Sequence, residues 1–380
     1  MLCFDLSPEQ QALQDNVARF TRDRIVPNAA ELDRDSTFPY EILKEAWELG
    51  LIAPIVPVEY GGAGASHVDQ ALICEELSYG CSGIETSIAA STLAATPIIL
   101  GGNEAQKKKY LGMISNEFAL CSYATTEPSA GSDVAAMQTR AVQKGDEWVL
   151  NGQKCFITNA SHARWYIIFA TLDPKLKHRG IAAFIVDRET PGLSLGKKED
   201  KLGQRASDTN TIMLEDAIVK SENLLAPAGV GFKLAMQTFD ATRPDIAMSA
   251  AGLMRRCIDE CVRYAKERKT FGQPIASHQA IQFMLAEMAM KAEATRLLAL
   301  KAASMLDKGQ RSSLYSAYAK ALGADSAMQS AIDAVQIFGG NGFIKDYPVE
   351  KLMRDAKILQ IYEGTSQIQR VVIGKHLLGG

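Results

Sequence analysis

The spacing of apolar residues changes twice along this 380-residue chain. It is helical up to about residue 118, changes to short β-rich runs over 119–225, and returns to long helical stretches over 226–380. A chain of this length exceeds the size at which one hydrophobic core usually keeps growing. We therefore expect a mainly α protein with a middle β domain, divided into a helical domain (1–118), a β domain (119–225) and a helical domain (226–380).

The helical stretches carry their own start and stop signals. Ser7, Pro8 and Gln10 give an N-cap, a first-turn proline and a capping-box partner, which predicts a helix to about Arg24. A second helix is predicted from about Pro39 to Gly50, and further helices over 68–77, 84–101 and 104–114. Amphipathic stretches around 245–267, after 279 and over 314–338 predict an antiparallel bundle.

The middle third is rich in β-branched and aromatic residues. Its runs predict strands over 147–150, 155–158, 165–171, 181–187 and 211–214. Asn151-Gly152 lies between the first two runs, and this dipeptide is typical of a tight hairpin turn. We expect a small antiparallel β domain.

Charge, apolar runs and cysteines limit the partners and the compartment. A formal net charge of −3 argues against nucleic acid or an anionic membrane as the main partner. No apolar run approaches the roughly 18 residues that cross a bilayer, so no transmembrane segment is predicted. The seven scattered cysteines favour a reducing compartment. The start of the chain resembles neither a signal nor a transit peptide, so the protein acts where it is made or has lost a presequence.

Several common catalytic motifs are absent from the sequence. No P-loop and no G-x-G-x-x-G after a strand is present, and the glycine-rich run 61–64 is interpreted as a plain turn. The five histidines never fall at metal-ligand spacing, and Cys257 and Cys261 are interpreted as ordinary helix residues, so no metal site is predicted. There is no G-x-S-x-G nucleophile elbow either.

Five polar, glycine-containing segments remain without a structural explanation. They are YATTEPSAGSD (123–133), NGQKCFITN (151–159), RKTFG (268–272), QIFGGNG (336–342) and MRDAKILQIYEGTSQIQR (353–370). In this order and at these distances, the chain resembles the acyl-CoA dehydrogenases over essentially its whole length, most closely their medium-chain branch. The resemblance implies an N-terminal helical domain, a middle β-barrel and a C-terminal four-helix bundle.

The resemblance also implies FAD as the cofactor and assigns its contacts. Arg268 offers a cationic fork suited to a pyrophosphate, and in this family its segment reaches the cofactor of a neighbouring subunit. Many relatives carry Trp at the position of Phe156. The phenylalanine keeps an aromatic face there but lacks the indole donor. The implied cofactor residues are Tyr123, Thr125, Thr126, Ser132, Phe156, Thr158, Arg268, Thr270, Phe271, Gln279, Gln336, Gly340, Thr365 and Gln367.

The same resemblance implies the substrate contacts and the catalytic base. Substrate contacts fall on Ser132, Asp240, Arg243, Tyr362 and Gly364. Branches of the family that handle isovaleryl or long-chain substrates place their catalytic glutamate at the position of Thr242. A threonine at this position cannot act as a base. Glu363 is therefore the implied base, and burial in an apolar cleft would raise its pKa.

The implied reaction is α,β-dehydrogenation of an acyl-CoA to a trans-2-enoyl-CoA in fatty-acid β-oxidation. Implied partners are electron transfer flavoprotein and further copies of the chain in a homotetramer, a dimer of dimers. The alternatives are a short- or branched-chain dehydrogenase and a non-catalytic scaffold protein on the same fold. The short length and the intact TEPSAGSD and YEGT segments argue against an oxygen-using oxidase or monooxygenase. The mitochondrial matrix and the bacterial cytoplasm both remain as compartments.

Overall fold

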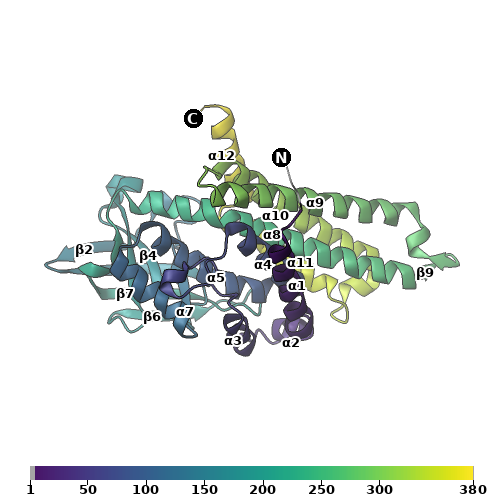
Figure 1. The fold of residues 1–380 in the computed structure, drawn as a ribbon, viewed down its shortest axis with the longest axis horizontal. Helices are drawn as coiled ribbons and strands as arrows, with labels where there is room; N and C mark the ends of the chain where they lie inside the picture. Colours follow the sequence, from purple (N-terminus) through teal and green to yellow (C-terminus); the bar gives the residue numbers. More distant parts are fainter. Residues whose placement is uncertain (1–4, 380) are drawn as a thin grey trace.

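The computed structural model describes residues 5–379, with helices at both ends of the chain and strands between them (Figure 1). The predicted capping box at the start of the first helix is confirmed: Ser7 Oγ accepts from the Gln10 amide at 3.2 Å, and the Ser7 amide donates to Gln10 Oε1 at 3.1 Å. A π-helical turn, Thr21–Ile25, carries this helix to the predicted end. The first helices are α1 (Pro8–Phe20), α2 (Ala29–Arg34), α3 (Tyr40–Glu48), α4 (His67–Gly80), α5 (Ser82–Gly101), α6 (Glu104–Gln106) and α7 (Gly112–Asn116).

Helix α5 corrects one expectation about apolar runs. By length and composition, its 20 residues could cross a membrane. Within the protein, however, 72% of its most apolar window is buried. A core helix surrounded by other elements has the same composition as a spanning one, because both are in contact with apolar groups on all sides.

The eight strands of the middle third form one sheet, in the order β6-β7-β3-β2-β4-β5-β8, with β1 pairing with β4. Neighbouring residues of β4 and β5 point to opposite faces, and both faces are buried. Trp165 and Phe169 pack with the N-terminal helices, whereas Tyr166 and Ile168 pack with side chains of β3 and β7, as expected inside a barrel. The strands are β1 (Leu120–Ala124), β2 (Arg140–Lys144), β3 (Glu147–Thr158), β4 (Ala163–Thr171), β5 (Ile181–Asp187), β6 (Leu193–Lys198), β7 (Thr209–Lys220) and β8 (Leu224–Ala226).

Two predictions about these strands are wrong. Asn151-Gly152 is not a hairpin turn, because β3 continues through it and the register against β7 shifts between Leu150 and Gly152. Glycine is required there by close approach: a Cβ on Gly152 would lie 2.6–2.9 Å from Thr139 atoms. The sheet is also not purely antiparallel, since β1 runs parallel to β4.

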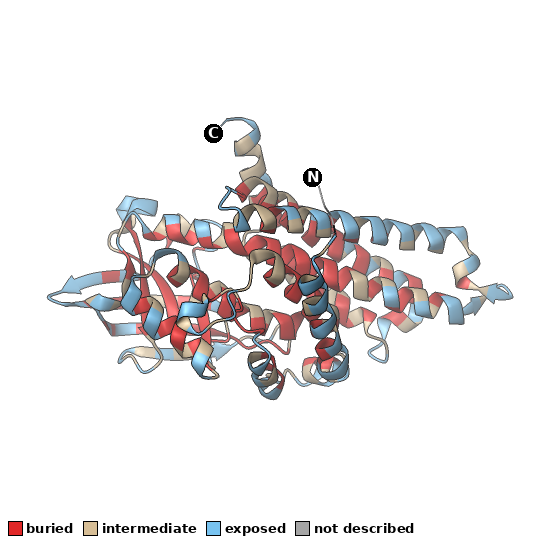
Figure 2. Ribbon diagram, viewed as in Figure 1, coloured by how far each residue is buried: buried red, intermediate tan, exposed pale blue. Residues whose placement is uncertain are grey.

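The last third forms a bundle of α8 (Gly231–Glu267), α9 (Gln279–Asp307), α10 (Ser313–Phe338) and α11 (Val349–Leu359). A short hairpin of β9 (Lys269–Thr270) and β10 (Gln273–Pro274) joins α8 to α9, and α12 (Ser366–Leu377) follows α11. Figure 2 shows buried residues along the middle of the bundle and exposed ones along the outer face of α9.

Helix α8 begins earlier than the predicted residue 245, and Pro244 lies inside it. A proline in a helix leaves the carbonyl four residues earlier without its amide donor. That carbonyl is Asp240 O, and the Ser316 hydroxyl of α10 donates to it at 3.0 Å. The serine on the neighbouring helix thus allows α8 to continue through the proline, which places Asp240, Thr242 and Arg243 on a rigid element.

Within residues 5–379, six cysteines are free and buried, and Cys3 lies outside the described residues. Cys257 and Cys261 are buried helix residues, as interpreted from the sequence. In this same part of the chain, no group of three or more His, Cys, Asp or Glu side chains is placed to hold a metal ion.

Candidate active site

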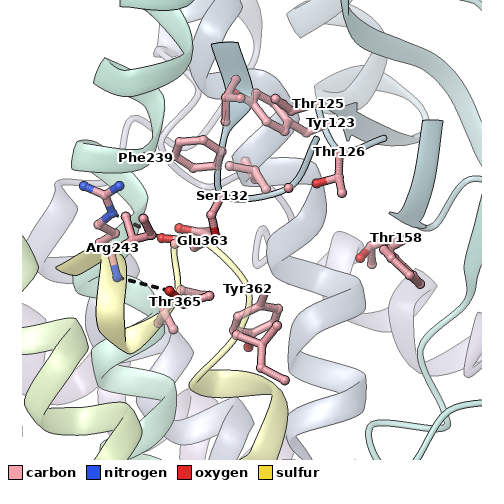
Figure 3. A pocket seen from close by; sticks show the side chains of 18 of the residues that line it. Tyr123, Thr125, Thr126, Ser132, Thr158, Phe239, Arg243, Tyr362, Glu363 and Thr365 are labelled. Carbon is pink, nitrogen blue, oxygen red and sulfur yellow. Dashed lines mark hydrogen bonds between the residues drawn. The ribbon is translucent and has the colours of Figure 1, made fainter. Parts of the chain in front are cut away.

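A cavity of about 510 Å³ lies where the three parts of the chain meet (Figure 3). Its walls come from α5, from β1 and the loop after it, from β3, from the first half of α8, and from the segment between α11 and α12. Of the predicted residues, those that line it are Tyr123, Thr125, Thr126, Ser132, Phe156, Thr158, Arg243, Tyr362, Glu363, Gly364 and Thr365.

Glu363 lies in the short turn between α11 and α12. Its φ of +51° and the φ of +89° at Gly364 place two consecutive residues in the left-handed region, which is unfavourable for a glutamate. The turn ends at Thr365, whose side chain caps α12 by accepting from the Ile368 amide at 3.1 Å. A helix end on each side therefore holds the glutamate at the cavity (Figure 3).

The carboxyl group of Glu363 lies in apolar surroundings with few polar contacts. Burial raises its pKa to about 6, while the Thr242 hydrogen bond and the charges of Arg243 and Lys320 act in the opposite direction. Thr242 Oγ1 is 2.8 Å from Glu363 Oε2. Thr242 cannot itself act as a base, but its hydroxyl donates a hydrogen bond to the Glu363 carboxylate, which can.

Several buried hydroxyl groups around the cavity have no hydrogen-bond partner within the described part of the chain. They are Tyr123 Oη, Thr125 Oγ1 and Tyr362 Oη. Buried polar atoms are almost always paired, so unpaired hydroxyls on residues that line a cavity indicate a polar ligand that completes them. Gly131 adds open space, since a Cβ there would meet no atom within 4 Å. These residues fit a large cofactor with hydrogen-bonding edges.

The loop that carries Thr125 and Thr126 is held by a buried ion pair. Lys154 Nζ lies 2.7 Å from Glu127 Oε1 and 3.2 Å from the Thr125 carbonyl, with the side chains of the pair 0% and 3% exposed. Glu127 also accepts from the backbone amides of residues 138 and 139. Lys154 therefore connects β3 to the loop that forms one wall of the cavity.

The other predicted residues do not line the cavity. Asp240 forms an ion pair with Arg243, with its Oδ1 2.7 Å from Arg243 Nη1. Gln367 is exposed on α12. The rest gather around the β9 hairpin at the far end of the bundle (Figure 1), where Tyr264 stacks on Phe338 at 4.0 Å between ring centroids. That group consists of Arg268, Thr270, Phe271, Gln279, Gln336 and Gly340, and Phe271 is 97% exposed.

Sequence reasoning missed three residues that the fold brings to this site. Glu85, an isolated acid in the apolar helix α5, lines the cavity, and burial raises its pKa to about 7. Phe239 of α8 packs edge-on against Tyr123. Lys320 of α10 donates to the carbonyl of Gly364. For the two charged residues, the signal in the sequence was a single charge within an otherwise small or apolar stretch of helix, which is weak by itself.

A largely apolar cavity with a carboxylate held on a turn, a second carboxyl group on α5 and several unpaired hydroxyls is the site of an enzyme that acts on a small molecule with the help of a cofactor. Similarity to known proteins gives the particular class. The chain matches the N-terminal domain of acyl-CoA dehydrogenases over residues 7–117, the middle domain over 122–217 and the C-terminal domain over 229–378. The protein belongs to the acyl-CoA dehydrogenase family and is an FAD-dependent oxidoreductase.

Individual relatives agree with this assignment. The Caenorhabditis briggsae protein named "Probable medium-chain specific acyl-CoA dehydrogenase 2, mitochondrial" is 48% identical, covering 100% of this chain and 92% of its own. Butyryl-CoA dehydrogenase from Megasphaera elsdenii superposes with a TM-score of 0.97 at 38% identity, covering 99% of this chain and 100% of that one. A chain from the structure of the electron transferring flavoprotein of Acidaminococcus fermentans has a TM-score of 0.97 at 42% identity, covering 100% of both chains.

Proposed function

We propose that this protein oxidises medium-chain acyl-CoA thioesters to trans-2-enoyl-CoA, with Glu363 as the base that removes the α-proton. The observation that carries this proposal is the Glu363 carboxylate, which lines the cavity and is held through one oxygen by Thr242. We assign to the other carboxylate oxygen, Glu363 Oε1, the role of accepting the α-proton of the substrate. The medium-chain relative supports the chain length, and the butyryl-CoA dehydrogenase neighbour keeps a shorter acyl chain as the alternative.

In the proposed reaction, the Glu363 carboxylate gains the α-proton and becomes neutral, which its apolar surroundings favour. Arg243 holds the turn in place during this step, because its Nε donates to the Glu363 carbonyl at 3.2 Å. The chemistry that FAD supplies when bound is acceptance of the hydride that leaves the β-carbon. The apolar wall of residues 89, 90 and 93 on α5 would hold the acyl chain and exclude water from the carboxylate.

The remaining assignments follow the two groups of residues in the structure. Within one subunit, FAD would be contacted by Tyr123, Thr125, Thr126, Ser132, Phe156, Thr158 and Thr365. The predicted residues around the β9 hairpin would reach the cofactor of a neighbouring subunit in a homotetramer. The exposure of Phe271 supports a role at a contact between subunits. We propose electron transfer flavoprotein as the electron acceptor, in the mitochondrial matrix or a bacterial cytoplasm.

The function is tested by mixing the FAD-loaded protein anaerobically with butyryl-, octanoyl- and palmitoyl-CoA and following the flavin absorbance. We expect the fastest bleaching with octanoyl-CoA. Flavin that stays oxidised with all three thioesters would contradict the dehydrogenase assignment and favour a scaffold protein. Rapid reoxidation by air with enoyl-CoA bound, rather than by electron transfer flavoprotein, would show an oxidase.

The rate of flavin reduction should depend on pH through Glu363. The base must be ionised, and burial raises its pKa to about 6. The rate should therefore rise with pH through about 6, and at pH 5 it should be about a tenth of its limiting value. Stopped-flow reduction by octanoyl-CoA from pH 5 to 8 measures this profile, and a rate that falls as pH rises through this range would contradict a carboxylate base.

Replacing Thr242 should shift that profile. Thr242→Val removes the hydroxyl that donates to the Glu363 carboxylate, so the pKa of Glu363 should rise and the midpoint of the rate profile should move up by about one pH unit. Thr242→Ser should restore the original midpoint. Thr238→Val is the matched control, because the Thr238 hydroxyl lies one turn earlier on α8 and donates to the Leu234 carbonyl. Equal shifts in Thr242→Val and Thr238→Val would exclude a specific effect of the Thr242 hydroxyl.

A further inference from the structure

The turn that carries Glu363 needs an external constraint to keep its shape. A glutamate with positive φ is unfavourable, and such strain persists only where surrounding groups hold it. Three side chains bind the carbonyls of Glu363 and Gly364 in this turn. Arg243 Nε donates to Glu363 O at 3.2 Å, Gln369 Nε2 donates to both carbonyls at 3.2 and 3.0 Å, and Lys320 Nζ donates to Gly364 O at 2.6 Å.

Lys320 makes the shortest of these contacts and is the least expected from its surroundings. It lies on α10 between Ala319 and Ala321, and it is fully buried. It is not among the residues that line the cavity. Burying an ammonium group costs several kcal/mol unless it is well paired, and here its hydrogen bond is to a backbone carbonyl rather than to a carboxylate.

The charges around Lys320 explain what an ammonium group adds over a neutral donor. Glu363 on the turn and Asp325 on α10 favour its charged form, while Arg243 on α8 opposes it. Burial has the largest effect and lowers the pKa of Lys320 to about 8, so the group remains cationic at neutral pH. In return, its charge favours the ionised form of Glu363.

We propose that Lys320 is a positioning residue of the active site, whose ammonium group holds the carbonyl of Gly364 and thereby fixes the left-handed turn that aims the Glu363 carboxylate into the cavity. The inference rests on the proposed role of Glu363 as the base. It adds a residue of α10 to the residues of α8 and α12 that hold this turn.

The test compares Lys320→Met, Lys320→Gln and the exposed control Lys308→Met, each as the FAD-loaded enzyme. With octanoyl-CoA under anaerobic conditions, Lys320→Met should lower the limiting rate of flavin reduction by about 10–100-fold, because a displacement of about 1 Å near the chemistry has an effect of this size. The half-saturating concentration should change by less than about threefold, since Lys320 does not line the cavity. The midpoint of the pH profile should move to higher pH.

Lys320→Gln keeps a donor and should recover part of the limiting rate, and Lys308→Met should match the parent.

A crystal structure of Lys320→Met gives a readout that does not depend on activity. We expect the turn over 362–365 to relax, with φ at Glu363 leaving the left-handed region. An unchanged turn, an unchanged limiting rate, or an effect on half-saturation alone would each overturn the proposal. If Lys320→Met does not fold, the same rate measurement and the same structure determination are made on Lys320→Gln, with Lys320→Arg as its comparison. If the base assignment itself is wrong, Glu363→Gln will still reduce flavin, whereas the relaxed turn of Lys320→Met will remain.

Discussion

Glu363→Gln should abolish flavin reduction while leaving the protein folded and its FAD bound. The amide has nearly the shape of the carboxylate and can still meet the Thr242 hydroxyl, which lies 2.8 Å from Oε2, but it cannot accept the α-proton. We expect the limiting rate with octanoyl-CoA to fall by about 10³–10⁴-fold, the upper part of the range for removing a general base. Stopped-flow absorbance measures the rate, and the flavin content of the purified variant is determined in parallel.

Glu85→Gln is the matched comparison, because Glu85 is a second carboxyl group that lines the cavity and whose pKa burial raises. Its Oε1 accepts from Ser249 Oγ at 2.9 Å, and it lies on the regular helix α5 rather than on a strained turn. We expect less than about a tenfold loss of rate. A larger loss in Glu85→Gln than in Glu363→Gln would transfer the role of the base to Glu85.

Lys154→Met should cause a large loss of stability. It leaves the Glu127 carboxylate buried without its cation, beside the loop that carries Thr125 and Thr126. Removing one partner of a buried pair costs about 3–5 kcal/mol. Unfolding by urea, followed by circular dichroism, should show a reduction of this size in the free energy of unfolding, and the affinity for FAD should fall with it.

Two controls separate the buried pair from a general effect of charge. Arg24→Met breaks the exposed pair with Glu45, whose side chains are 46% and 36% exposed, and it should cost less than about 1 kcal/mol. Adding Glu127→Gln to Lys154→Met should recover part of the lost stability, because the unpaired charge is gone. Equal losses in Lys154→Met and Arg24→Met would contradict the role given to the buried pair.

The order of elements could be predicted from sequence because its signals are local. Helical and β periodicities, the capping box at Ser7 and the stop at Gly50 each depend on residues within one or two turns of the chain. The prediction for Asn151-Gly152 failed for the same reason. Its local pattern is that of a turn, but the pairing of β3 with β7 and the contact of Gly152 with Thr139 lie outside any local window.

Helix α8 shows a second limit of local signals. A proline often marks a helix boundary, and the stretch predicted from the sequence begins only at residue 245, directly after Pro244. In the folded chain, Ser316 donates to the carbonyl of Asp240 that the proline leaves free, and the helix continues. Donor and acceptor are 76 residues apart, and only the packing of α10 on α8 brings them together.

The succession of helical, β and helical segments, the family resemblance and the position of Glu363 in its motif can all be read from the amino-acid sequence. The surroundings of that carboxylate appear only in the folded chain: the Thr242 hydroxyl on α8, the Arg243 and Lys320 donors that hold its turn, and the second acid Glu85. This division arises because a pKa and an orientation depend on burial and on contacts between residues far apart in the chain, which no local pattern of residues encodes.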